Sequence, residues 1–145
     1  MLFGKIDHNY KIKNRRNIFN FFKTNNIKFL NEVLPLKQQY DFELPKMYIK
    51  TFKKLKNKLN NKIYFIEDFY NFSGSFKDRA SLIACLDAKE KKMKEISVAS
   101  SGNAAISTAI FCNMFELKCS VFIPSFSSIE KKKYLKSLGC KIFEF

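Results

Sequence analysis

The chain has 145 residues, a hydrophobic content of 46% and a formal net charge of +14. This length and apolar content suit one ordinary globular domain, while four Gly and three Pro exclude the collagen-like and low-complexity classes. Lysines spread over the whole chain and only three arginines argue against nucleic-acid binding as the main function, and no apolar run is long enough to span a bilayer.

Residues 1–31 hold seven Lys or Arg and a single acidic residue, Asp7. This basicity resembles an organelle-targeting segment, but such segments are usually rich in Ser and this one is not. We interpret residues 1–31 as a basic N-terminal extension, disordered or targeting, ahead of a domain at 32–145. A cytoplasmic location is favoured, with organelle targeting as the alternative.

From residue 62 onward, β-branched and aromatic runs alternate with segments of helical apolar spacing. Strands that alternate with helices give right-handed crossovers and a mostly parallel, doubly wound sheet. The predicted fold class is therefore α/β. We expect strands at 62–69, 96–100, 118–124 and 140–145, and helices at 76–94, 104–115 and 127–139.

Two of these helices have distinctive patterns. The helix at 104–115 is apolar nearly all round, so it is expected to be buried. The helix at 76–94 ends in lysines, which suit the negative end of the helix dipole. Its apolar residues at helical spacing are Phe76, Ala80, Ile83, Ala84 and Ala88.

The four cysteines show no Cys-x-x-Cys spacing, and the single histidine, His8, is far from them in sequence. Zinc ligation and a Cys/His nucleophile are therefore not supported, and we predict no metal site. Cys85 and Cys112 fall in apolar helical stretches, where they are expected to act as small buried hydrophobic residues. This cysteine usage is typical of a reducing compartment.

Small-residue turns at 73–75 and 100–103 each follow a predicted strand and precede a predicted helix. Ligands of open α/β sheets bind beyond the carboxyl ends of the strands, so a site is expected at these turns. Lys77 lies in the first turn of its helix, where the positive end of the dipole favours a neutral amine. Such an amine can attack a carbonyl and form a Schiff base. The alternative is a surface lysine beside Asp78.

The second turn has the sequence Ser100-Ser101-Gly102-Asn103. It opens a helix whose free N–H groups and dipole attract an anion such as a carboxylate. Gly permits close approach to the backbone, and the hydroxyl and amide groups add donors. The alternative is simple N-capping, for which Ser and Asn are favoured residues.

Together, the two turns resemble a known family. "NFSGSFKDRA" (71–80) resembles the Asn-Pro-Thr-Gly-Ser-Phe-Lys-Asp-Arg-Gly signature of pyridoxal-phosphate enzymes of the tryptophan synthase β-like superfamily, fold type II. "ASSGNAAIS" (99–107) is similar to the Ser-Gly-Asn substrate loop of the same enzymes, and the combination is most similar to threonine synthases. The chain departs from the signature at Phe72, Ser73 and Ala80.

The resemblance implies pyridoxal 5'-phosphate as the cofactor. It implies that Lys77 binds this cofactor covalently and moves protons at the substrate carbons as general base and acid. By the same resemblance, Asn103 hydrogen-bonds the phenolic oxygen of the pyridoxal ring. Ser100, Ser101 and Gly102 hold the α-carboxylate of a small amino-acid substrate.

The implied activity is that of a carbon–oxygen lyase that converts O-phospho-L-homoserine and water to L-threonine and phosphate. The alternatives are a threonine or serine dehydratase and a non-catalytic remnant of such an enzyme. Phe76 is implied to pack, and Asp78 with Arg79 to fix the helix start.

The family also has a glycine-rich loop for the cofactor phosphate and a polar partner for the pyridine nitrogen, further along the chain. After Asn103 the only glycine is Gly139. We therefore expect the N-terminal portion of a longer enzyme, inactive alone. Its expected partners are a separately encoded C-terminal part or, in the complete enzyme, a second copy in a homodimer, with no nucleic-acid or membrane partner.

Overall fold

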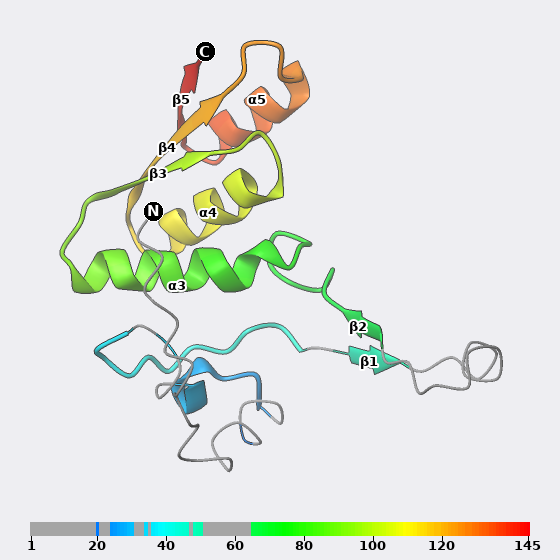
Figure 1. Ribbon diagram of the computed structural model, residues 1–145, viewed down its shortest axis with the longest axis vertical. Helices are drawn as coiled ribbons and strands as arrows, with labels where there is room; N and C mark the ends of the chain where they lie inside the picture. The colour runs from blue at the N-terminus through cyan, green and yellow to red at the C-terminus, as the bar shows by residue number, and fades with distance from the viewer. Residues whose placement is uncertain (1–19, 21–23, 31–33, 35, 47, 51–64) are drawn as a thin grey trace, which may run out of the picture.

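The computed structural model describes residues 20, 24–30, 34, 36–46, 48–50 and 65–145. A small antiparallel strand pair precedes a region in which strands and helices alternate (Figure 1). The elements are η1 (a 3-10 helix, Ile27–Leu30), β1 (Tyr48–Lys50), β2 (Phe65–Glu67), α3 (Lys77–Glu90), β3 (Glu95–Ala99), α4 (Asn103–Met114), β4 (Lys118–Ile123), α5 (Ile129–Ser137) and β5 (Lys141–Glu144).

Strands β3, β4 and β5 form a parallel sheet in that order. On the central strand β4, Val121 pairs with Val98 of β3 on one side and with Ile142 of β5 on the other. Neighbouring parallel strands need a long crossover connection, and here α4 and α5 provide the two crossovers. The α/β class with a parallel sheet is therefore confirmed.

The first predicted strand does not join this sheet. Within the predicted range 62–69, residues 65–67 form β2, and residues 62–64 lie outside the described part of the chain. Strand β2 pairs antiparallel with β1 in a separate sheet. Its partner β1 lies at 48–50, before the region from residue 62 onward in which strands and helices alternate. The alternating pattern therefore could not predict this pairing.

Helix α4 lies between the parallel sheet and α3 (Figure 1). It contacts β3 and β4 of the sheet, and it also contacts α3 and α5. Ala105, Ala109 and Phe111 are completely buried as a result. A helix covered on several sides must be apolar nearly all round, so the prediction of a buried helix here is confirmed.

Helices α3 and α4 lie side by side and run in the same direction (Figure 1). The hydroxyl oxygens of Ser81 and Thr108 are 3.2 Å apart, and the sulfur atoms of Cys85 and Cys112 are 3.9 Å apart. Each pair joins residues separated by 27 positions. The two contacts therefore define one register along the helices and place both N-termini at the same end.

The buried face of α3 agrees only in part with the predicted one, in which Ala88 is buried as expected. Leu82, Cys85 and Leu86 are buried, whereas Ala80 and Ala84 of the predicted apolar set are exposed. The reason is that α3 is covered on two sides, by α4 and by the segment around η1. The residues of α3 alone do not indicate where that second segment packs.

Helix α3 ends at Glu90, before the end of the lysine run that was expected to belong to it. Lys92 has a positive φ of 55°. The N–H groups of Lys92 and Met93 donate to the carbonyl oxygens of Lys89 and Ala88 at 2.9 Å each. These hydrogen bonds satisfy carbonyl groups of the last turn and stop the helix.

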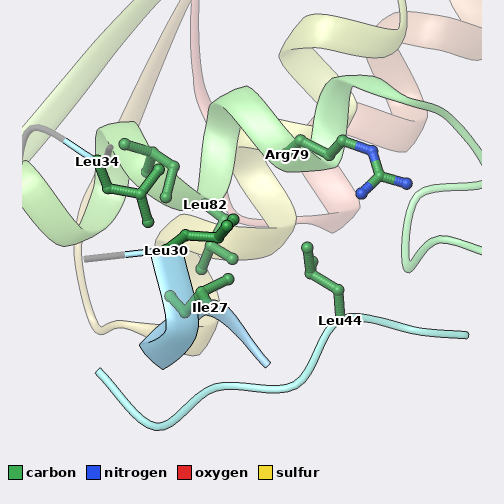
Figure 2. Close-up of a pocket in the computed structure, with 7 residues that line it drawn as sticks. Ile27, Leu30, Leu34, Leu44, Arg79 and Leu82 are labelled. Atoms are coloured by element: carbon green, nitrogen blue, oxygen red, sulfur yellow. The ribbon is translucent and has the colours of Figure 1, made fainter. Parts of the chain in front are cut away.

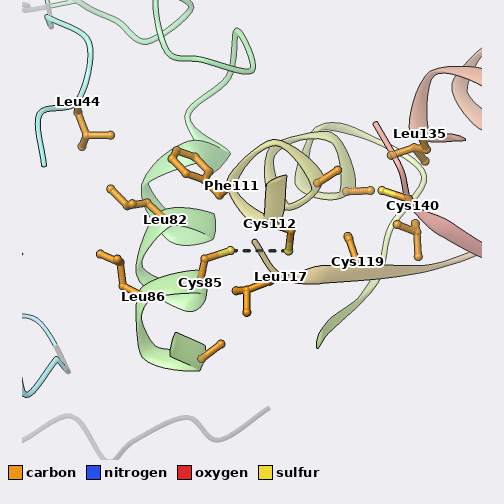
Figure 3. Close-up of a cluster of buried hydrophobic side chains, with 14 of the residues drawn as sticks. Leu44, Leu82, Cys85, Leu86, Phe111, Cys112, Leu117, Cys119, Leu135 and Cys140 are labelled. Carbon is orange, nitrogen blue, oxygen red and sulfur yellow. Dashed lines mark hydrogen bonds between the residues drawn. The ribbon is translucent and has the colours of Figure 1, made fainter. Parts of the chain in front are cut away.

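The four cysteines are free and buried, and they lie in a row from α3 across α4 and β4 to the start of β5 (Figure 3). The expected burial of Cys85 and Cys112 is confirmed. A hydrogen bond from Cys119 lowers the pKa of Cys112, but the Cys85 thiol and burial outweigh it and raise this pKa to about 12. The Cys112 thiol and burial raise the pKa of Cys119 to about 12. The thiols of Cys112 and Cys119 are therefore protonated at neutral pH.

The segment around η1 packs against α3. Ile27 is buried, and its N–H donates to the Phe42 carbonyl at 3.0 Å. A cavity of about 120 Å³ remains between this segment and α3 (Figure 2), with the Arg79 guanidinium pointing away from its aliphatic side chains. The cavity is lined by Ile27, Leu30, Leu34, Leu44, Arg79, Leu82 and Ile83.

Most of the predicted N-terminal extension, at 1–19, 21–23 and 31, lies outside the described residues. Its residues at 24–30 are described and contact the rest of the chain, since the Asn26 side chain hydrogen-bonds Asp41 at 2.5 Å. Across the described ranges, none of the helices has the length and apolar character needed to cross a membrane.

Candidate active site

The two predicted turns lie at the same end of the molecule. Lys77 is the first residue of α3, and Asn103 is the first residue of α4. The separation of 27 positions that joins Ser81 to Thr108 and Cys85 to Cys112 matches Lys77 to Ala104, one turn nearer the N-termini. Residues 100–102 follow β3 directly, so this turn lies at the carboxyl edge of the parallel sheet, where ligands of such sheets bind. The turn at 73–75 comes after β2, which belongs to the other sheet.

The segment that leads into α3 is tied to the end of β2. The Asn71 side chain donates to the Asp68 carbonyl at 2.7 Å and to the Ser75 carbonyl at 3.1 Å. Gly74 turns the chain with a φ of 72°, a conformation that residues with a Cβ rarely adopt. Arg79 donates two hydrogen bonds to the Asp68 carboxylate, which lowers the pKa of Asp68.

Asp78 closes the same turn from the helix side. Its carboxylate is completely buried and accepts hydrogen bonds from the Ser73 N–H, at 2.8 Å, and from the Ser73 hydroxyl. The Ser73 and Ser75 hydroxyl oxygens are 2.9 Å apart, and the Lys77 N–H donates to Ser75 Oγ at 3.3 Å. These contacts, with the Asp68 ion pair of Arg79, confirm that Asp78 and Arg79 fix the helix start.

The Lys77 side chain is half-buried, and its Nζ lies 4.3 Å from the centre of the Phe76 ring. No ion pair involves this amine among the described residues. The prediction that Phe76 packs is wrong, because the ring is 59% exposed and covers one side of the amine instead. The adjacent Asp78 directs its carboxylate to Ser73, so a simple surface pair of Lys77 with Asp78 is not formed.

The second turn leaves backbone donors free at the start of α4. Gly102 precedes the helix and donates its N–H to Ser100 Oγ at 3.2 Å. The Gly102 carbonyl accepts two helical N–H groups, while the N–H groups of Asn103 and Ala104 have no partner within the described ranges. No side chain caps α4, so the alternative of simple N-capping is not supported. Free N–H groups at a helix start attract an anion.

The same turn has room for a ligand. A Cβ added at Gly102 would meet no heavy atom within 4 Å. Asn103 is exposed, and the side chains of Ser101 and Asn103 make no hydrogen bond with any described residue. With Lys77, this edge therefore presents an amine, an amide, a hydroxyl and unpaired backbone N–H groups. None of these residues lines the cavity beside η1.

Sequence reasoning missed the part that Ser73 plays. This residue was noted only as a departure from the signature, yet its N–H and hydroxyl both bind the buried carboxylate five residues later. The signal was present in the sequence, because a hydroxyl residue and an acid bracket the glycine turn before α3. Ser and Asp side chains often close such turns by hydrogen bonds to the nearby backbone.

The comparisons with known proteins point to one family of enzymes. Residues 48–145 match the family model described as "Pyridoxal-phosphate dependent enzyme". The chain is 41% identical over 54 residues to threonine synthase of Bacillus sp. (strain ULM1), and the aligned part covers 37% of this chain and 15% of that protein.

Solved structures support the fold. The crystal structure of a pyridoxal 5'-phosphate-dependent aspartate racemase has a TM-score of 0.61 and 23% identity, covering 68% of this chain and 32% of that chain. The processed form of threonine deaminase isoform 2 from Solanum lycopersicum has a TM-score of 0.60 and 19% identity, covering 70% of this chain and 28% of that chain. This chain therefore spans about a third of those structures or less. From the match over 48–145, the chain belongs to the pyridoxal-phosphate-dependent enzyme family, whose cofactor is pyridoxal 5'-phosphate.

Proposed function

We propose that this chain is the part of a threonine synthase-type lyase that carries the cofactor lysine and the substrate-carboxylate turn. The proposed reaction converts O-phospho-L-homoserine and water to L-threonine and phosphate. The observation that carries the proposal is the 41% identity over 54 residues to a threonine synthase. The position of Lys77 and Asn103 at adjacent helix starts supports it.

The two turns fit the cofactor and an amino-acid substrate. The Lys77 amine has no carboxylate partner among the described residues, so it is available to an aldehyde. The exposed Asn103 amide and the open space at Gly102 leave room for a ligand at the start of α4. When bound, pyridoxal phosphate acts as an electron sink that stabilises negative charge at a substrate carbon.

Each residue has a distinct task in this proposal. Lys77 holds the cofactor through its amine and later accepts a proton from one substrate carbon and returns one to another. Asn103 donates from its side-chain amide to the phenolic oxygen of the ring. Ser100, Ser101 and Gly102 hold the substrate carboxylate, with the Ser101 hydroxyl as donor and the Ser100 hydroxyl shaping the turn by accepting the Gly102 N–H.

The remaining parts of the enzyme are proposed to come from further polypeptide, since the chain spans 15% of the threonine synthase and 28% to 32% of the two solved structures. That polypeptide would supply the loop for the cofactor phosphate and the partner of the pyridine nitrogen. We assign 32–145 to this enzyme domain and 1–31 to a basic extension, in a cytoplasmic protein that acts on a small amino acid.

The attachment of the cofactor can be tested by chemical trapping. The protein is incubated with limiting pyridoxal phosphate, reduced with borohydride and mapped by peptide mass spectrometry. We expect the label on Lys77 ahead of the other 23 lysines. Lys77→Arg should abolish this label and the visible absorbance of the bound cofactor, whereas Lys89→Arg, farther along the same helix, should change neither. A label that favours Lys89 would refute the assignment.

The reaction itself distinguishes threonine synthase from a dehydratase. The chain is assayed alone and together with the polypeptide that supplies the remaining part, for phosphate release from O-phospho-L-homoserine and for ammonia release from L-threonine. We expect phosphate release only from the combination. Asn103→Ala should shift the cofactor spectrum and slow turnover, because the ring loses its proposed amide donor. Stability should hardly change, because the Asn103 side chain makes no capping bond. Ammonia release without phosphate release would support the dehydratase instead.

A further inference from the structure

We propose that Asp78 is a positioning residue for Lys77, and that it acts through a one-way chain of hydrogen bonds across the turn at 73–77. The inference rests on the proposed role of Lys77 as the cofactor lysine. The groups inferred to fix the position of Lys77 are the Asp78 carboxylate and the hydroxyls of Ser73 and Ser75.

The direction of each hydrogen bond follows from the donors available. The Asp78 carboxylate has no hydrogen to give, so the Ser73 hydroxyl must donate to it. Because the only hydroxyl hydrogen of Ser73 is used in this way, the 2.9 Å contact between the two hydroxyls requires Ser75 to donate to Ser73. Ser75 Oγ is then free to accept from the Lys77 N–H at 3.3 Å. Every donor and acceptor is matched in one direction.

This series of hydrogen bonds begins at the backbone N–H of Lys77 and ends on the buried carboxylate of Asp78. The carboxylate of Asp78 is completely buried, and no cation pairs with it among the described residues. Its hydrogen bonds from the N–H and hydroxyl of Ser73 therefore replace water as the partners of the charge. Hydrogen bonds to a charged group are stronger than neutral ones, and serial bonds polarise one another.

An amide at position 78 cannot replace the carboxylate, even though it has the same shape. Both groups that approach from Ser73 are donors, and an amide offers one oxygen and one NH₂ group. In one orientation the NH₂ group faces the Ser73 N–H. In the other it faces the Ser73 hydroxyl, which must then donate to Ser75 instead, so the Ser75 hydroxyl hydrogen loses its acceptor in the turn. Asp78→Asn therefore disrupts the hydrogen-bond chain in either orientation.

The hydrogen bonds from the Lys77 N–H to Asp78 affect the position of Lys77 as well as the stability of the turn. The turn contains Gly74 with its φ of 72°, so its backbone path must be fixed by contacts rather than by local preference. One anchor ties the turn to β2 through Asp68 and Arg79. The chain that ends on Asp78 is the second anchor, and it includes the backbone N–H of the lysine itself.

The test compares four variants of the protein. Asp78→Asn and Ser73→Ala break the chain, whereas Ser73→Thr keeps the hydroxyl. Asp87→Asn removes a carboxylate of the same helix that pairs with Lys91 at the surface, so it is the matched control. Two readouts are taken for each: amide hydrogen exchange at the Lys77 N–H, and the share of borohydride-trapped pyridoxal phosphate found on Lys77.

We expect exchange at the Lys77 N–H to become about tenfold faster in Asp78→Asn and Ser73→Ala, because the Ser75 hydroxyl that accepts this N–H is no longer held in place; tenfold is the factor that corresponds to losing one hydrogen bond in a charged network. The share of label on Lys77 should fall in the same two variants and stay unchanged in Ser73→Thr and Asp87→Asn. A merely structural role would raise exchange along all of α3 and leave the distribution of the label unchanged, and that result would overturn the inference. If the unmodified protein shows no preference for Lys77, the proposed function fails instead, and the exchange result still reports on the hydrogen-bond chain.

Discussion

Replacing Gly74 by alanine tests whether the left-handed turn before α3 serves the site, because Gly139 provides a matched control. The two glycines have φ values of 72° and 76°. A Cβ added at Gly74 would lie 3.9 Å from the Phe69 carbonyl oxygen, and one added at Gly139 would lie 3.9 Å from Asn113 Oδ1. Both distances are ordinary van der Waals contacts, so neither substitution creates a clash.

The cost of each substitution then comes from the backbone alone. A residue with a Cβ loses about 1–2 kcal/mol in the left-handed conformation. The more restricted unfolded chain returns about 0.4–1 kcal/mol to the alanine variant. The free energy of unfolding should therefore fall by about 1 kcal/mol in Gly74→Ala and by the same amount in Gly139→Ala.

The two variants should differ in the chemistry of the lysine. Urea unfolding followed by circular dichroism measures the stability of each, and borohydride trapping of pyridoxal phosphate measures the share of label on Lys77. We expect equal losses of stability but a smaller share of label only in Gly74→Ala. Gly74→Asn should lie between Gly74→Ala and the unmodified protein, since Asn tolerates a positive φ better. A loss above about 3 kcal/mol at Gly74, or equal labelling in both alanine variants, would refute this reasoning.

Two further predictions concern the folded chain away from the turns. Unfolded thiols lose their protons near pH 8.5, whereas the pKa values of Cys112 and Cys119 in the folded protein are about 12. The contribution of the two protonated thiols to folding stability is therefore fully present below about pH 8.5 and is lost as the pH rises toward 12. The free energy of unfolding should therefore fall as the pH rises above about 9, and Cys112→Ala should reduce this fall, measured by urea titration at several pH values. Ser128 caps α5 by accepting the Lys131 N–H at 3.4 Å, so Ser128→Ala should cost about 1 kcal/mol; a loss equal to that of the neighbouring, non-capping Ser127→Ala would contradict the capping role.

The positions of the elements from β2 onward were predictable from the sequence because their causes are local. β-Branched and aromatic runs, small-residue turns and helical apolar spacing act over a few neighbouring residues. The helix predicted at 127–139 illustrates this, since Ser128 caps α5 and Gly139 follows it with a positive φ. The parallel sheet followed in turn from the order of strands and helices. The two turns before Lys77 and Asn103 were also recognisable from short stretches of sequence, at 71–80 and 99–107.

What the tertiary structure alone decided depends on segments that are distant in the chain. The buried face of α3 is set by η1 as well as by α4, so Leu82 and Leu86 are covered while Ala84 is exposed. Strand β2 pairs with a strand that the alternating pattern does not include. The position of both helix starts at the same end of the molecule depends on the parallel packing of α3 on α4, in which side chains 27 residues apart are in contact. Local residues determine which elements form, but the segment that covers each face is chosen by packing across the whole chain.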